Sequence, residues 1–156
     1  MNTILITLHV IAAILFLGPV TVAVSTFHVR ALAAHNGDET ARGSAVTLHK
    51  IAQTYGNLSV LVPILGFGIM FTANNYWSDG RFHASIALSL VAWIILLFVI
   101  VPRQKKMLGS LGLLDADEQA SYSEEITDWN KAKAQLSMFG GIFSLLWVVI
   151  AVLMLI

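Results

Sequence analysis

An apolar run from Thr3 to Phe27 constrains this chain more than any other feature of its sequence. The run is longer than the roughly 20 residues that a helix needs to cross the hydrocarbon layer at ~1.5 Å per residue. His9 is its only ionisable side chain. The first ten residues lack the basic segment of a secretory signal, and the apolar run is too long for the core of one. The run therefore predicts a permanent membrane-spanning helix over residues 3–27.

Three further apolar runs predict three more spans, at residues 51–73, 82–101 and 136–156. Polar stretches separate the four spans, at residues 28–50, 74–81 and 102–135. Hydrophobic residues make up 57% of the chain and charged residues 12%, about half of the roughly 25% charge of a soluble domain. The sequence predicts one all-α domain over residues 1–156, folded as an integral membrane four-helix up-down bundle.

The basic residues predict how this bundle lies in the membrane. Of the nine Lys and Arg residues, all except Arg81 lie in the connections 28–50 and 102–135. Because basic loops stay on the cytoplasmic side, both connections should be cytoplasmic and both termini should face outward. We expect an integral membrane protein with the lipid bilayer as its surroundings. A net charge of +0 gives no basic surface for nucleic acid.

Two histidines are the candidate cofactor ligands. His9 lies about six residues from the outer end of its span, or ~9 Å at helical rise, and His83 lies near the outer edge of the third span. A histidine pair can hold a b-type haem from opposite faces, although the two depths differ. The alternative is a neutral His9 that hydrogen-bonds to a neighbouring span. Whether any metal is bound is left open.

Small and polar residues within the spans are candidates for helix packing or partner binding. Gly18 and Pro19 should loosen or kink the first span, because proline cannot donate to the carbonyl four residues back. The other members of this set lie in the second and fourth spans: Asn57, Gly66, Gly68, Gly140 and Gly141.

The connections carry helix signals of their own. Asn36, Gly37 and Asp38 predict a helix stop, a turn and a new N-cap. Asp115 and Glu118 form a possible capping box. A helical stripe follows, because apolar and aromatic residues recur at steps of four and three: Tyr122, Ile126 and Trp129. This stripe is expected to lie on the membrane surface, to extend the fourth span, or to dock a partner.

Several classes of function lack their usual residues. No Asp, Glu, Lys or Arg lies inside a predicted span, so the sequence offers no proton relay or charged substrate site of the kind that pumps use. The chain has no cysteine and no phosphate-binding loop, zinc-protease or serine-hydrolase motif. We assign no catalytic residue, and the sequence favours a protein that is not an enzyme.

The opening LHVIAAILFLGPVTVA and the later RFHASIALSLVAWIILLFVIVPRQKKM resemble domain-of-unknown-function family 2269, uncharacterised four-span bacterial proteins. This resemblance implies a protein of the bacterial inner membrane. More distantly, an LH pair followed by small residues and a glycine is similar to the copper-resistance D membrane proteins and the membrane protoporphyrinogen oxidases. The resemblance to those oxidases implies haem binding at His9. The resemblance to copper-resistance D implies copper handling, for which His9, His83 and five methionines are available.

Three functions therefore remain open at the level of sequence. The first is a non-catalytic accessory or assembly subunit that packs against a larger membrane complex, such as a respiratory one, or against other copies of itself. The second is a haem-binding redox protein that uses His9. The third is a copper-handling membrane protein.

Overall fold

A computed structural model describes residues 2–72 and 74–156, and all regular structure in these ranges is helical. The elements in chain order are α1 (Asn2–Ala12), η1 (Ala13–Leu17), α2 (Gly18–His35), α3 (Glu39–Leu58), α4 (Leu61–Met70), η2 (Asn74–Ser78), α5 (Gly80–Ile94), η3 (Ile95–Ile100), α6 (Val101–Ser110), α7 (Ala116–Ala120) and α8 (Trp129–Leu155). The expectation of an all-α protein is confirmed.

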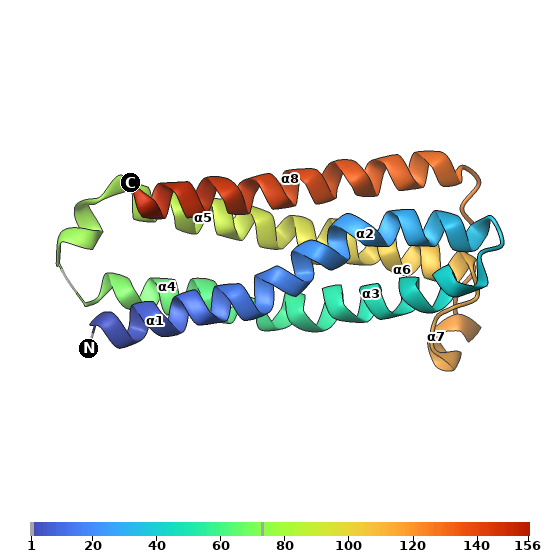
Figure 1. The fold of residues 1–156 in the computed structure, drawn as a ribbon, viewed down its shortest axis with the longest axis horizontal. Helices are drawn as coiled ribbons and strands as arrows, with labels where there is room; N and C mark the ends of the chain where they lie inside the picture. Colours follow the sequence, from blue (N-terminus) through green and yellow to red (C-terminus); the bar gives the residue numbers. More distant parts are fainter. Residues whose placement is uncertain (1, 73) are drawn as a thin grey trace.

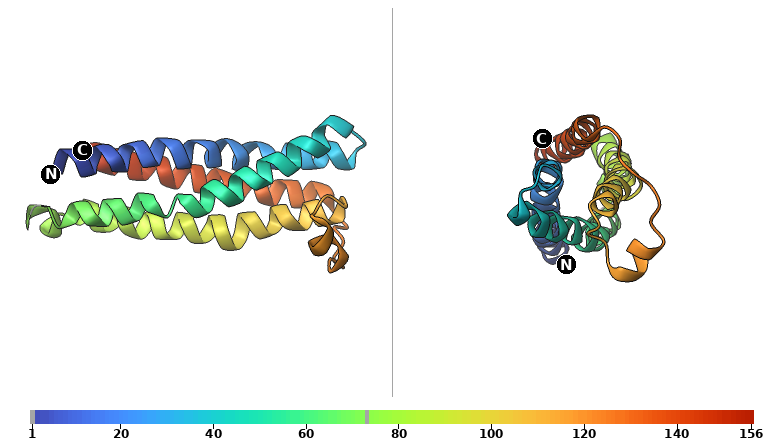
Figure 2. Two further views of the ribbon diagram at one scale, coloured as in Figure 1. Left: turned by 90° about the horizontal axis from the view of Figure 1, so that it is seen from below. Right: turned by 90° about the vertical axis from the view of Figure 1, so that its right-hand side faces the viewer.

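The long helices lie lengthwise beside one another (Figure 1). The continuous helix formed by α1, η1 and α2 crosses the bundle obliquely (Figure 1). As a result α1 packs on α4, whereas α2 packs on α3 and α8. Both termini lie at one end, and α7 with its flanking loops lies at the other. An end-on view shows the helices surrounding a common centre (Figure 2), which fully buried side chains fill, among them Val24, Phe27, Leu96 and Phe143.

Three helices are long and apolar enough to span a membrane: Thr3–His35, Gly80–Ser110 and Trp129–Leu155. They contain the predicted first and third spans and nearly all of the fourth. Each extends into a predicted connection, since the helices continue to His35 and Ser110 and α8 begins before residue 136. These lengths and compositions indicate a membrane protein.

The predicted second span, residues 51–73, is not one continuous helix. It contains the end of α3, a break at Ser59 and Val60, and then α4. Its last predicted residue, Ala73, lies outside the described residues.

Each of the three prolines follows a local distortion of its helix. The π-helical segment η1 ends two residues before Pro19, the α3–α4 break precedes Pro63, and η3 ends two residues before Pro102. Because proline has no N–H and its ring crowds the carbonyl four residues back, a regular ladder cannot pass through it. The loosening expected at Gly18 and Pro19 is present as η1.

The turn between α2 and α3 forms as the sequence predicts. α2 ends at His35, and Gly37 follows with a φ of 99°, a left-handed conformation that favours glycine. The Asp38 carboxylate then caps α3 by accepting hydrogen bonds from the backbone N–H groups of Thr40 and Ala41.

The long connection before α8 departs from its prediction. Asp115 is the N-cap of α7, although its side chain makes no cap hydrogen bond, and Glu118 instead pairs with Lys105 at 2.8 Å. α7 ends at Ala120, and the chain from residue 121 to 128 is not helical. The expected helical stripe through Tyr122 and Ile126 is therefore wrong, and only Trp129 lies in a helix.

Candidate functional site

His9 joins α1 to α4. Its Nδ1 lies 2.9 Å from the carbonyl oxygen of Val62, and its ring covers Gly66, where a Cβ would lie 3.0 Å from His9 Cε1. Gly66 is thus a packing residue within the chain, because a larger side chain would displace the imidazole. The sequence predicts either a cofactor ligand or a hydrogen bond to a neighbouring span, and His9 makes the hydrogen bond.

This hydrogen bond determines which nitrogen of His9 carries the proton. A carbonyl oxygen only accepts, so Nδ1 must donate and, in the neutral ring, Nε2 keeps its lone pair. A histidine held in this way has one nitrogen with which it could bind a metal. His9 therefore offers at most one ligand position.

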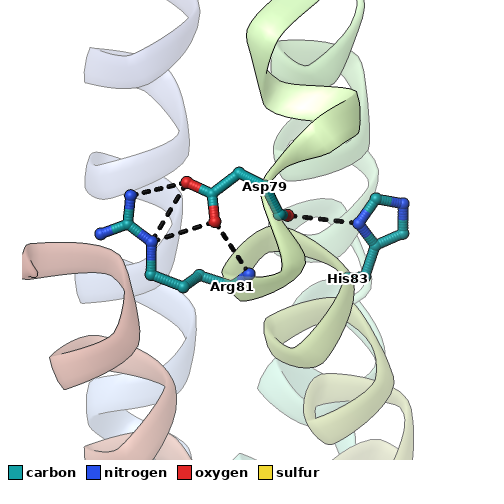
Figure 3. A network of polar contacts seen from close by, with 3 residues as sticks. All are labelled: Asp79, Arg81 and His83. Atoms are coloured by element: carbon teal, nitrogen blue, oxygen red, sulfur yellow. Dashed lines mark hydrogen bonds and ion pairs between the residues drawn. The ribbon is translucent and has the colours of Figure 1, made fainter.

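His83 lies in a different environment from His9. Its Nδ1 is 3.2 Å from the carbonyl oxygen of Asp79, its side chain is exposed, and its ring lies edge-on to Trp77. Figure 3 shows the ring pointing away from the Asp79–Arg81 pair. Among the described residues no contact connects His83 with His9, so the geometry does not bring the two expected haem ligands together.

Asp79 caps α5 and binds Arg81 in the same network (Figure 3). Its carboxylate accepts the Arg81 backbone N–H at 3.0 Å and contacts the guanidinium at 2.6 Å. Hydrogen bonding from Arg81 lowers the pKa of Asp79 to about 2. This stabilisation is present above the ordinary carboxyl pKa and is lost as the pH falls through about 2.

We expect Asp79→Asn to lower thermal stability in detergent at pH 7, and the difference from wild type to shrink between pH 4 and about 2. The wild-type carboxylate becomes protonated in this range, so both proteins then lack the charge. Thermal unfolding followed by circular dichroism at several pH values measures the difference. A difference that stays constant down to pH 2 would show that charge at Asp79 is not responsible.

The predicted packing residues fall into two groups. At Gly140 a Cβ would lie 3.0 Å from Val24 Cγ1 and 3.3 Å from the Val24 carbonyl oxygen, so Gly140, like Gly66, allows two helices of this chain to approach closely. Around the others an added Cβ meets nothing within 4 Å: Gly18, Gly68 and Gly141. Pro19 is half-buried and Asn57 is exposed.

A close contact that the sequence analysis did not identify lies at Gly56. A Cβ there would lie 3.0 Å from Leu96 Cδ2, and the Gly56 carbonyl accepts a hydrogen bond from Trp93 Nε1 at 3.2 Å. Glycines are common in membrane spans, so the sequence alone does not single out Gly56. Only the pairing of α3 with α5 and η3 shows that Gly56 lies at a close helix contact.

Two further polar residues, also missed by the sequence analysis, meet inside the bundle. His49 Nδ1 lies 3.1 Å from Gln104 Oε1, with His49 7% and Gln104 0% exposed. Burial lowers the pKa of His49, although the hydrogen bond to Gln104 opposes the shift, so the ring is neutral at pH 7. The bond links α3 to α6, although the buried Gln104 Nε2 has no hydrogen-bond partner among the described residues.

The residues of the expected stripe pack onto their own chain. The Tyr122 hydroxyl donates to the Lys106 carbonyl at 2.8 Å, and its ring lies on Gly109, where a Cβ would be only 2.5 Å from a ring carbon. Ile126 packs against the core. Trp129 is buried and stacks on His35 with ring centroids 4.3 Å apart. These contacts hold the connection between α6 and α8 against the bundle.

The described residues contain no group of three or more His, Cys, Asp or Glu side chains that could hold a metal ion. Near the α7 end, hollows that are open rather than enclosed lie on the surface of the described residues. One lies between His35 and Asp128, and a second lies between α6 and α8.

Comparison with known proteins adds no relative. No family model, no curated protein and no solved structure matches this chain. The resemblance to domain-of-unknown-function family 2269 therefore stays a prediction, and the function has to be argued from the geometry alone.

Proposed function

We propose that this chain is a non-catalytic, four-span subunit of the bacterial inner membrane that packs against other membrane helices, either of a larger assembly or of further copies of itself. In this arrangement α3 from residue 51 onward and α4 together form the second span, and both termini face outward. The distribution of Lys and Arg supports this orientation.

The observation that carries this proposal is an exposed polar face on α3. The side chains of Gln53, Thr54 and Asn57 are all exposed. Within the described part of the chain, none of the three side chains has a hydrogen-bond partner. Their spacing of one and four residues places them on one side of the helix.

Contacts of the neighbouring residues support a position of this face near mid-depth. Gly56 meets Trp93 and Leu96, which lie midway along the candidate span Gly80–Ser110. Tyr55 meets Phe16, with ring centroids 6.5 Å apart, and Phe16 lies near the middle of the candidate span Thr3–His35. In a bilayer the exposed amides would thus lie in the hydrocarbon region.

An exposed amide at this depth needs a partner. Lipid tails offer no hydrogen bonds, so each unpaired polar group there costs several kcal/mol. A helix from another subunit can satisfy these amides. The open surfaces at Gly18, Gly68 and Gly141 are further places where a neighbouring helix can approach closely.

We expect Gln53→Leu/Asn57→Leu to detach the chain from its assembly without unfolding it. Each hydrogen bond between membrane helices contributes about 1 kcal/mol, so the double variant should associate roughly tenfold or more weakly. The measurement is the assembly size on native gels and the co-purifying chains, after gentle extraction from the native membrane. Retention of both at wild-type levels would contradict the proposal.

Since the chain has no cysteine, single cysteines can locate the contact. We expect Asn57→Cys to cross-link to one discrete partner in native membranes. Leu145→Cys is the matched control, because Leu145 is 62% exposed and lies on α8, which does not pack against α3. Equal, diffuse cross-linking at both positions would indicate random collision in the bilayer.

A further inference from the structure

The second hollow lies between α6 and α8, has a volume of about 410 Å³, and is lined by three cations, Arg103, Lys106 and Lys131. Arg103 and Lys131 make no ion pair among the described residues. Lys106 is paired with Glu124 at 2.7 Å. The hollow thus holds two basic side chains that are in no ion pair within the described residues.

The acidic groups that line the hollow are not paired with Arg103 or Lys131. The Asp128 carboxylate accepts a hydrogen bond from the backbone N–H of Lys131 at 2.9 Å as the cap of α8. Glu125 is exposed and makes no ion pair with Arg103 or Lys131 within the described residues. With Glu124 counted beside its partner Lys106, three cations and three carboxylates surround the hollow. Arg103 and Lys131 are nevertheless in no ion pair within the described residues, so their N–H groups can bind an anion.

Arg103 is held in place although it has no acidic partner. Its guanidinium carbon lies 4.8 Å from the centroid of the Phe139 ring, and Nη1 reaches the Val99 carbonyl only at 3.5 Å. Stacking on an aromatic ring orients a guanidinium while leaving most of its N–H groups available. A guanidinium in this state suits a phosphate, which it can bind through two parallel hydrogen bonds.

The position of the hollow identifies the source of that phosphate. Arg103 lies on the candidate span Gly80–Ser110 and Lys131 on Trp129–Leu155, at the end of the molecule that carries the basic connections. Towards mid-membrane both helices continue with exposed apolar side chains, including Phe98 at 71% and Met138 at 53%. A headgroup site above apolar helix surface fits a phospholipid, whose acyl chains would lie along those helices.

We propose that the hollow between α6 and α8 binds the phosphate of an anionic phospholipid through Arg103 and Lys131. The proposal uses the membrane location of the chain but not its partner. It would therefore stand if the face around Asn57 proved to contact nothing.

The test uses the full chain in mild detergent, titrated with phosphatidylglycerol and followed by native mass spectrometry. We expect one bound lipid, and a loss of affinity of about fivefold for each cation removed, or about 25-fold for Arg103→Gln/Lys131→Gln. The matched control is Arg30→Gln/Lys133→Gln, which removes the same charge from residues outside the hollow and should change affinity less than about twofold.

Three results would overturn the proposal. Equal weakening of both double variants would show general charge attraction, and equal binding of phosphatidylcholine would show no need for an anionic headgroup. Displacement of the lipid by millimolar inorganic phosphate would assign the hollow to a soluble anion. If the double variant does not fold, Lys131→Gln alone, at an exposed side chain, should still show the fivefold loss.

Discussion

Replacing Gly140 with leucine should destabilise the protein by about 1–3 kcal/mol, because the new side chain has no space between α8 and α2. Its Cβ would lie 3.0 Å from Val24 Cγ1 and 3.3 Å from the Val24 carbonyl oxygen. A side chain can rotate away, but a backbone carbonyl in mid-helix cannot, so the two helices must separate. The apparent Tm in detergent should fall by roughly 3–10 °C for a chain of this size.

The neighbouring glycine provides the control. An added Cβ at Gly141 meets nothing within 4 Å, so Gly141→Leu makes the same change in hydropathy and helix propensity without the clash. We expect it to retain wild-type stability or to gain slightly, since glycine is unfavourable inside a helix. Equal melting of the two variants would show that close approach of α2 and α8 at Gly140 is not required.

Hydropathy and local turn chemistry predict much of this fold. Each candidate span coincides with a long apolar run, and the turn at Gly37 forms where the residues required for positive φ and for an N-cap follow one another. Pro19 marks a distorted helix because its effect is local and steric. These features depend on residues close together in sequence, so a single sequence reveals them.

Contacts between distant residues could not be predicted in the same way. The pairing of His49 with Gln104, and the contact of Gly56 with Leu96, depend on how α3 aligns with the helix containing α5, η3 and α6. His9 illustrates the limit, because its residue type and depth allow both a ligand and a hydrogen bond. Only the position of the Val62 carbonyl shows that the hydrogen bond forms.

The stripe through Tyr122, Ile126 and Trp129 shows how periodicity can mislead. Its spacing fits a helix, yet Asp128 is the N-cap of α8. Because an N-cap residue has a non-helical backbone, a new helix begins at Trp129 and does not continue from the segment before it. Ser123 and Thr127, which lie between the stripe residues, also have low helix propensity. The stripe residues pack on different parts of the bundle. Their spacing of four and three residues is the same as that of one helical face, so the spacing alone cannot separate these two arrangements.

The packing of the connection that contains Tyr122 against α6 should depend on a single glycine, Gly109. At Gly109 a Cβ would lie 2.5 Å from a ring carbon of Tyr122, so Gly109→Ala should displace the ring and the hydroxyl bond to the Lys106 carbonyl with it. Overpacking of this kind costs about 1–3 kcal/mol. We expect lower thermal stability, together with faster cleavage at Glu118 and Glu124 by a glutamate-specific protease.

Two controls separate this clash from other effects of alanine. Gly43 lies inside α3 with nothing within 4 Å of an added Cβ, so Gly43→Ala should stabilise by about 0.5–1 kcal/mol, the opposite sign. In a Tyr122→Ala background the ring is absent, and Gly109→Ala should then cost little. If Gly109→Ala costs as much in that background as in wild type, the tyrosine does not hold the connection against α6.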